Sequence, residues 1–517
     1  MSDTETRPSL SASGAVAVLD RLRDGPRAVP QPSLLSSEAL AVARAPTPTP
    51  ISPIVLAGAV RMGEFALIVL TGLAVYVAYL LPQEDFAWRY LGATFGIALL
   101  SMLAFQVADI YQVQAFRGYE KQYMRLASAW SLVFLLVIGG SFFSKTGEMF
   151  SRLWLGSFYV CGLAVLILSR NVLFYAVRRW TREGRLTRRT VIVGGGEPGA
   201  AVIEQLRQQK DSGVEIIGLF DDRGDGRGGA ECAGQRKLGS VDDLVEFGRR
   251  TRVDLVIFSL PISAEGRILQ MLKKLWVLPV DIRLAAHTNK LQFRPRSYSY
   301  IGNVPVLDVF DRPIADWDVV MKWLFDKVIG TLALVCALPA MALIALAVKL
   351  DSRGPVLFKQ KRYGFNNDLI EVYKFRSMYV DSADAAADRL VTKGDDRVTR
   401  IGRFIRKASL DELPQLFNVV FKGNLSLVGP RPHAVNAKAE ARLYAEAVDG
   451  YFARHRVRPG ITGWAQINGW RGETDTHEKI QKRVEHDLHY IENWSVLFDL
   501  YILARTPIAL LKTENAY

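Results

Sequence analysis

Long apolar runs separated by short polar stretches occupy the chain between residues 53 and 180. Each run approaches the roughly 20 residues that an α-helix needs to cross the hydrocarbon core of a bilayer. The pattern therefore predicts a four-helix transmembrane bundle. Its apolar runs lie at about 62–82, 89–108, 125–143 and 154–174.

The residues on either side of the bundle are polar. Residues 1–52 are rich in Ser, Pro, Ala and Thr and contain no apolar core long enough for a signal peptide, so we expect a disordered tail. The loop after the second run carries Arg117, Lys121 and Arg125, and seven arginines lie between residues 170 and 189. Because Lys and Arg accumulate in cytoplasmic loops, these segments and the rest of the chain are predicted to be cytoplasmic.

After residue 189 the pattern changes to short apolar strands that alternate with amphipathic helices, which is typical of an α/β fold. We predict a Rossmann-like, doubly wound domain at 186–310. The expected strands are 190–193, 214–220, 254–260 and 278–284, and the expected helices run from about 194 to 209, 240 to 251 and 264 to 276.

A glycine fingerprint follows the first of these strands. Gly194, Gly196 and Gly199 have the G-x-G-x-x-G spacing, and Asp221 or Asp222 follows at the interval of a ribose contact. Gly194, Gly196, Gly199 and Asp221 are therefore candidate nucleotide-binding residues. A structural remnant of a nucleotide-binding fold explains the same pattern. The chain has no Tyr-x-x-x-Lys pair, which argues against a short-chain dehydrogenase.

A fifth apolar run covers about 328–350 and is interrupted in its middle by Pro339. Cations flank it on both sides, Lys322 and Lys327 before it and Lys349 and Arg353 after it. Hydropathy alone predicts a fifth span. The proline and the charges at both ends also fit a helix that enters and leaves the membrane by the same face.

Two adjacent carboxylates, Asp411 and Glu412, lie in a basic region that ends at Arg431. Ser409 stands three residues before Glu412, a capping-box spacing that predicts the pair in a first helical turn. A carboxylate beside arginines supplies an anionic nucleophile and cations that neutralise phosphoryl oxygens. Ordinary first-turn acids would give the same local pattern.

Several longer motifs surround this pair in order. They are Gln360–Gly364, Tyr373–Met378, Ser-Leu-Asp-Glu-Leu-Pro-Gln from residue 409, Val-Gly-Pro-Arg-Pro from residue 428, and Arg458–Gln466. Over roughly 320–517 the chain resembles the bacterial sugar transferases that move a hexose-1-phosphate from a UDP-sugar to a polyprenyl phosphate. The resemblance implies a catalytic domain at 311–517, of α-rich α+β type, that begins with a re-entrant membrane helix.

The resemblance also implies a reaction. Asp411 would attack the β-phosphorus of a UDP-hexose, release UMP and pass the sugar phosphate to undecaprenyl phosphate, while Glu412 would hold Mg²⁺. Arg431 matches a phosphate-contacting arginine. The pattern at 461–468 with 471–474 looks most like glucose-using members that start exopolysaccharide or capsule assembly, and UDP-galactose stays the alternative donor. Because nucleotide sugars are cytoplasmic, the catalytic domain should face the cytoplasm from the bacterial inner membrane.

Further cations are candidates for phosphate binding. Lys361, Arg362, Lys374 and Arg376 follow the re-entrant run and would lie at headgroup depth. Arg456 and Arg458 are expected to add to the donor site. A generic basic face on anionic lipid is the alternative for the first four. His433 and His455 are expected in surface or core positions.

The overall hydrophobic content and net charge agree with an integral membrane protein that binds anions. Of 517 residues, 50% are hydrophobic and the net charge is +13. The basic run abuts an apolar span, so we predict lipid and phosphate partners and no nucleic acid. Three scattered cysteines form neither a metal spacing nor a disulfide framework. A nucleotide-sensing membrane regulator is the alternative from another class, and a homo-oligomer stays open.

Overall fold

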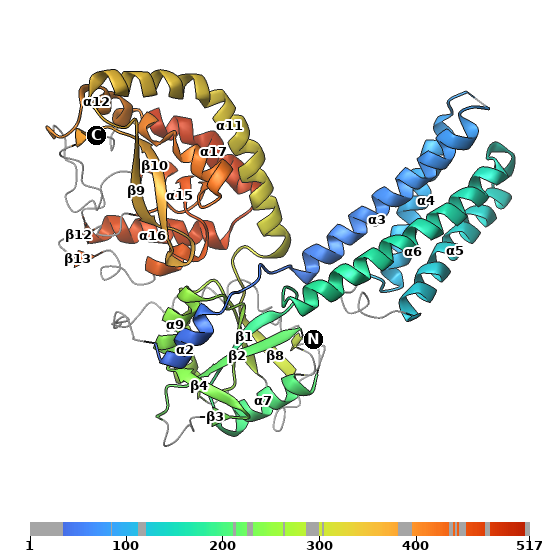
Figure 1. Cartoon of the computed structure of the whole chain (residues 1–517), viewed down its shortest axis with the longest axis horizontal. Helices are drawn as coiled ribbons and strands as arrows, with labels where there is room; N and C mark the ends of the chain where they lie inside the picture. The colour runs from blue at the N-terminus through green and yellow to red at the C-terminus, as the bar shows by residue number, and fades with distance from the viewer. Residues whose placement is uncertain are drawn as a thin grey trace, which may run out of the picture. The chain divides into compact units, whose positions relative to one another are not determined.

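The computed structural model forms two compact units, one from Pro46 to Thr187 and one from Met1–Ala45 together with Arg188–Tyr517. Figure 1 shows the helical bundle of the first unit and the two α/β parts of the second. The structure describes residues 35–83, 85–111, 120–209, 213–224, 231–261, 264–285, 299–301, 304–380, 395–433, 438–439, 442–443, 451–470 and 476–511.

Four long apolar helices make up the first unit, as the hydropathy pattern predicts. They are α3 (Pro53–Val75), which continues as the π-helical turn η1 (Tyr76–Leu80), α4 (Trp88–Val107), α5 (Glu120–Phe143) and α6 (Arg152–Arg182). Aromatic side chains such as Tyr90, Trp130 and Phe158 fill the bundle interior. Many Leu and Phe side chains point outward and are exposed, which suits a lipid-facing surface.

Part of the expected disordered tail is helical. Helix α2 (Ser37–Arg44) is capped by the Ser36 side chain, which also donates to the carbonyl of Leu238 at 2.9 Å. Leu35 and Ala39 are buried in the core of the middle domain. The Pro- and Ser-rich composition of the whole segment predicted disorder. It did not reveal that a few apolar residues within the segment pack on the middle domain. The residues before 35 lie outside the described part.

The middle domain is an eight-stranded sheet in the order β3-β4-β2-β1-β5-β6-β8-β7. Strands β2, β1, β5 and β6 are parallel, as predicted; β4, which joins them in parallel, and the antiparallel pairings of β3, β8 and β7 were not predicted. Its strands are β1 (Arg188–Val193), β2 (Val214–Phe220), β3 (Glu231–Cys232), β4 (Gln235–Gly239), β5 (Leu255–Phe258), β6 (Asp281–Ala285), β7 (Ser299–Ile301) and β8 (Val304–Phe310).

Helices cover both faces of this sheet, as in a doubly wound fold. Helices α9 (Val241–Arg250) and α10 (Glu265–Leu275) border one apolar core, and α7 (Gly196–Gln208) borders the other.

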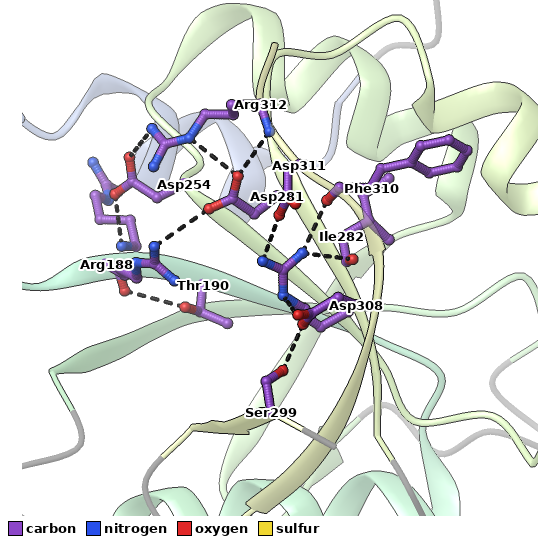
Figure 2. Close-up of polar contacts among 12 residues, drawn as sticks. Arg188, Thr190, Asp254, Asp281, Ile282, Ser299, Asp308, Phe310, Asp311 and Arg312 are labelled. Atoms are coloured by element: carbon purple, nitrogen blue, oxygen red, sulfur yellow. Dashed lines mark hydrogen bonds and ion pairs between the residues drawn. The ribbon is translucent and has the colours of Figure 1, made fainter. Parts of the chain in front are cut away.

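A polar network gathers where β1, β5 and β6 begin (Figure 2). Arg188 lies 3.4 Å from Asp281, and Arg312 lies 3.3 Å from Asp281 and 3.7 Å from Asp254. The backbone N–H of Arg312 also donates to Asp281 at 3.0 Å. The contacts of Arg312 therefore attach the segment between β8 and the following helix to the N-terminal ends of β5 and β6.

Helix α11 (Asp316–Asp351) contains the fifth apolar run and stays helical through Pro339. Figure 1 shows it as two arms joined by a bend. Both arms contact the same domain, because Lys322 donates to the carbonyl of Val428 and Asp351 accepts from the N–H of Ile401. A straight helix of this length would measure about 54 Å, so the bend lets both ends contact one body, as a re-entrant helix requires.

The rest of the C-terminal domain packs inside the arc of α11 (Figure 1). A hairpin of β9 (Leu357–Tyr363) and β10 (Leu369–Phe375) follows α11. Further elements are α12 (Arg400–Lys407), η8 (Leu410–Glu412), α13 (Gln415–Phe417), η9 (Asn418–Lys422), β11 (Ser426–Val428), η10 (Tyr451–Arg456), β14 (Gly460–Thr462), α15 (Trp464–Ile467), α16 (His477–Glu492) and α17 (Val496–Leu511), with the short pair β12 (Lys438–Ala439) and β13 (Arg442–Leu443).

Candidate active site

Asp411 and Glu412 lie in the 3₁₀ turn η8, directly after α12. Ser409 adopts a left-handed conformation (φ 55°), and its side chain does not cap the turn, so the predicted capping box is wrong. A single 3₁₀ turn has little of the dipole of a long helix. Nearby cations must therefore provide the positive potential at these carboxylates.

Glu412 is bound by two cations from different elements. Its carboxylate accepts from Lys374 on β10 at 2.9 Å and from Arg431 at 2.5 and 3.1 Å. Glu412 is buried, and burial alone would raise its pKa. The attraction of Arg431 and Lys374 outweighs burial and holds the pKa of Glu412 well below its ordinary value. Glu412 is therefore ionised at neutral pH.

Asp411 has a different environment from its neighbour. It is only 8% exposed, and burial raises its pKa above the ordinary value, with the negative charge of Glu412 acting in the same direction. Lys374, Arg406 and Arg431 oppose this shift without cancelling it. A carboxylate that is poorly solvated but faced by cations is more nucleophilic than one stabilised by direct ion pairs.

The buried side-chain amide of Asn418 holds the strand that carries Lys374. The side chain of Asn418 accepts from the backbone of Tyr373 at 3.0 Å and donates to the carbonyl of Glu371 at 2.7 Å. These two bonds attach β10 to η9, the turn that follows the carboxylates. Burial lowers the pKa of Lys374, whereas the charge of Glu412 raises it.

Arg431 lies in a loop whose carbonyl groups are all bound. The carbonyls of residues 430 to 433 accept, in order, from Gly460 N–H at 3.0 Å, the Arg454 side chain at 2.6 Å, the Arg362 side chain at 2.5 Å and Tyr363 N–H at 3.4 Å. Prolines at 430 and 432 also restrict the backbone. The backbone of the loop is therefore held in place, and the side chain of Arg431 reaches Glu412.

Two of the predicted phosphate-binding cations have structural contacts instead. Arg362 donates to the side chain of Gln360 and to the carbonyl of Pro432, so it supports the loop. Arg376 lies past the end of β10 and donates to the carbonyls of Ser352 and Arg353, each at 2.7 Å, where α11 ends. Gly354 has φ +130°, and any side chain there would collide with Arg376.

Three other predicted cations make no ion pair with the carboxylates among the described residues. Lys361 and Arg458 are exposed. Arg456 is buried and donates to the carbonyl of Asp311 at 3.3 Å, and burial lowers its pKa to about 10. His433 and His455 are buried, as expected, and burial lowers the pKa of each well below its ordinary value. We do not include Arg456 in the site.

The glycine fingerprint of the middle domain surrounds an internal ion pair. Asp221 accepts from Gly195 N–H at 2.7 Å and pairs with Arg223 at 2.6 Å, and Arg223 donates to the carbonyl of Gly195. Gly199 allows α7 to approach the Gly194 carbonyl closely. Gly194 and Gly196 have positive φ. These contacts account for the spacing structurally, and the ribose-binding role of Asp221 stays a prediction.

Sequence reasoning missed Arg454, Asp487 and Asn418. Arg454 and Asp487 form a buried ion pair at 2.6 Å with side chains 1% and 2% exposed. The two residues stand far apart in the chain and lie in stretches with several other charges, so no local pattern identifies them. Asn418 directly follows an apolar run, where a polar residue is a weak signal.

The carboxylates limit which metals the site suits. Among the described residues, no group of three or more His, Cys, Asp or Glu side chains is arranged to hold a metal ion. Mg²⁺ commonly uses one or two carboxylates and completes its shell with water and substrate phosphates. Asp411 and Glu412 fit that pattern, provided that a phosphate group takes over some contacts of Lys374 and Arg431.

Two family models match the chain. A model of bacterial sugar transferases matches residues 317–513, which contain the carboxylates, both paired cations and α11. A model described as a CoA-binding domain matches residues 106–286, which include α6 and most of the middle sheet.

The chain is also similar to proteins of known name. A UDP-glucose:undecaprenyl-phosphate glucose-1-phosphate transferase of Xanthomonas campestris pv. campestris is 35% identical, over 81% of this chain and 86% of the relative. A protein of the same name from Klebsiella pneumoniae is 34% identical, over 88% and 96%. The exopolysaccharide production protein PSS of Rhizobium leguminosarum bv. phaseoli is 46% identical, over 37% of this chain and 96% of the relative.

Proposed function

The chain belongs to the bacterial sugar transferase family, and from this membership we propose that it transfers glucose-1-phosphate from UDP-glucose to undecaprenyl phosphate. The reaction releases UMP and provides the first membrane-bound intermediate of an exopolysaccharide or capsule. The observation that carries the proposal is the Asp411–Glu412 turn, in which one carboxylate is buried with no close ion pair to any described residue while the other holds Lys374 and Arg431.

The first half of the reaction forms a covalent intermediate. A carboxylate oxygen of Asp411 attacks the β-phosphorus of UDP-glucose, and the bond from that phosphorus to the bridging oxygen breaks. UMP leaves with the bonding electrons, and Asp411 becomes a glucosyl-phosphoryl ester. Lys374 and Arg431 neutralise the charge that develops on the phosphoryl oxygens.

The second half regenerates the carboxylate. A phosphate oxygen of undecaprenyl phosphate attacks the same phosphorus, and the bond to Asp411 breaks. The product is undecaprenyl diphosphate glucose. Dividing the reaction in this way means that the aqueous donor and the lipid acceptor need not occupy the site together.

We propose that Mg²⁺ takes part, held by Glu412 and by diphosphate oxygens of the donor. When bound, the ion would neutralise phosphate charge and act as a Lewis acid. Arrival of a diphosphate also offers Lys374 and Arg431 a second anion, which would release one oxygen of Glu412 for coordination.

We further propose that the catalytic domain faces the cytoplasm from the bacterial inner membrane. Six arginines between residues 178 and 189 support this orientation, since they follow the fourth apolar run. Both ends of α11 contact the same domain, so the helix need not carry the site to the other side.

The experiment that tests the function is transfer of radiolabelled glucose phosphate from UDP-glucose to undecaprenyl phosphate in membranes that contain the protein. Asp411→Asn should abolish both lipid labelling and UMP release. Glu371→Gln is the matched control, because Glu371 lies near the site but its side chain is exposed and pairs with the exposed Lys359 and Lys422. Equal UMP release by Asp411→Asn and wild type would exclude covalent catalysis by Asp411.

The donor and the intermediate need separate measurements. A panel that includes UDP-galactose tests the sugar, and the proposal expects UDP-glucose to give the highest kcat/KM. Incubation with donor alone, followed by mass spectrometry, should give a hexose-phosphate adduct on the peptide that contains residue 411. Active protein that never forms this adduct would contradict the two-step route.

A further inference from the structure

We propose that Arg454, held by Asp487, is a positioning residue that fixes the backbone of Arg431 for phosphate binding. The proposal rests on the function proposed above, because it assigns Arg431 to the phosphates of the donor. Arg454 touches neither carboxylate of the catalytic turn in the described structure; it acts through the loop that carries Arg431.

Among the described arginines of the C-terminal domain, Arg454 is the most deeply buried. Its residue is 1% exposed, and its partner Asp487 on α16 is also 1% exposed. A nitrogen of Arg454 lies 2.6 Å from Asp487. Attraction between two such desolvated charges is strong only when the geometry is good and the remaining donors are bound.

The two terminal nitrogens of Arg454 also contact the Arg431 loop, whereas its Nε has no hydrogen-bond partner among the described residues. One terminal nitrogen donates to the carbonyl of Arg431 at 2.6 Å, and the other lies 2.6 Å from Nδ1 of His433. The hydroxyl of Tyr451 lies 2.9 Å from the same ring nitrogen. Arg454 therefore holds the loop on both sides of Pro432, at the residue whose side chain binds Glu412 and at the second residue after it.

Planar, multi-point contact of this kind requires a guanidinium. Arginine presents five N–H donors in a fixed plane, whereas a lysine ammonium is a single flexible point charge. A lysine at 454 could neutralise Asp487 but could not reach Asp487, the Arg431 carbonyl and His433 together. The loop would then lose a fixed point directly at Arg431, and small displacements of a phosphate-binding group cost up to about 10²-fold in rate.

The test compares steady-state kinetics of Arg454→Lys and wild type in the transfer assay. Lysine keeps the positive charge beside Asp487, so the variant avoids an unpaired buried carboxylate. We expect the KM for UDP-glucose to rise about tenfold and kcat/KM to fall by about 10²-fold, while the KM for undecaprenyl phosphate stays unchanged. A merely structural residue would lower the amount of active enzyme without this selective change in KM.

Arg456→Lys is the matched control. Arg456 lies in the same turn, η10, and is similarly buried, but it donates to the carbonyl of Asp311. Its substitution should lower the thermal unfolding temperature without changing the KM for UDP-glucose. Asp487→Asn provides a second variant should Arg454→Lys fail to fold, and it should raise the same KM about threefold, because a neutral amide binds Arg454 more weakly.

A double-variant comparison shows whether Arg454 acts through Arg431. In an Arg431→Ala background, Arg454→Lys should cause no further loss of kcat/KM, because the group that it positions is absent. Additive losses, or an unchanged KM for UDP-glucose in Arg454→Lys, would overturn the assignment. Wild type that transfers no sugar phosphate at all would instead refute the proposed function, so the two failures are distinguishable.

Discussion

At the scale of single residues, the two neighbouring carboxylates of the catalytic turn have opposite electrostatic environments. Glu412 is stabilised as an anion by Arg431 and Lys374, whereas burial raises the pKa of Asp411. Carboxylate pairs with divided roles commonly differ in this way. The group with the higher pKa is the one that must lose its proton before it can attack phosphorus.

The first prediction concerns the acidic limb of the pH profile. Because Asp411 must be ionised, kcat/KM for UDP-glucose should fall as pH decreases through its raised pKa. The charge of Glu412 contributes to that rise, so Glu412→Gln should move the limb to lower pH while reducing the maximal rate. Profiles between about pH 4 and 8 would measure the shift. A limb that stays in place would mean that Asp411 does not control it.

At the scale of elements, α11 is joined to the catalytic core by a buried polar network. Lys322 lies 2.5 Å from Asp499 of α17 and donates to the carbonyl of Val428 at 2.9 Å. Tyr490 of α16 bonds to the same carbonyl and to Asp499. The strand that leads into the Arg431 loop is thereby attached to the membrane helix.

A second prediction follows from this network. Lys322→Met should destabilise the protein by about 3–5 kcal/mol, because Asp499 is completely buried and would lose its cation. Denaturant unfolding in detergent would measure the change. Lys349→Met is the control at the other end of α11, where Lys349 is exposed, and it should change stability by less than about 0.5 kcal/mol. Similar losses in both variants would argue against the network.

The topology of α11 gives the third prediction. Single cysteines placed at the exposed residues Asp318 and Arg353, in a chain whose own three cysteines are replaced, should react with an impermeant thiol reagent from the same face of the membrane. The bend brings both ends to one domain. Labelling from opposite faces would require a crossing helix.

The C-terminal part shows what the sequence could and could not predict. The adjacent pair Asp411–Glu412 and the cation Arg431 stand in one stretch, so their meeting was predictable. Lys374 and Arg376 alternate as strand neighbours, but β10 ends at Phe375 and Arg376 turns toward α11. Hydropathy fits both a crossing helix and a re-entrant helix for the run around Pro339. The contacts made by its two ends are tertiary, and the local sequence does not specify them.

At the scale of the whole molecule, the residues that we propose for catalysis and their supporting contacts lie in the C-terminal part. Lys374, Asp411, Glu412, Arg431 and the Arg454–Asp487 pair are contributed by residues after 316. The middle domain touches this part through Asn366, which donates to the carbonyl of Gly248, and through Arg249, which lies over the ring of Phe452. These contacts are on η6 (Phe365–Asn367) and η10, not on the catalytic turn.

The fourth prediction is that a fragment of residues 311–517 retains transfer activity. We expect kcat/KM for UDP-glucose within about tenfold of the full chain, since the fragment loses only the contacts of α9 and of the sheet. Activity would be compared in nanodiscs at equal protein concentration. An inactive but folded fragment would show that the middle domain supplies something essential.

The middle domain shows which strands of a sheet the hydrophobic pattern of the sequence can predict and which it cannot. The parallel strands around Val191 and Val256 are continuous apolar runs with helices between them, so they were predictable. Strands β7 and β8 pair antiparallel at one edge, and the first residues of β8 alternate in burial whereas those of β7 do not. The position of an edge strand depends mainly on the strand that it pairs with, and the local sequence does not identify that strand.

The bend of α11 has a mechanical consequence for the lipid around it. Its outward leucines, among them Leu332, Leu343 and Leu346, are exposed along both arms. In the proposed re-entrant topology, α11 displaces acyl chains from one leaflet and leaves the opposite leaflet intact. Such a wedge increases the area of a single monolayer, so the protein should sort toward regions of the membrane whose curvature accommodates that extra area.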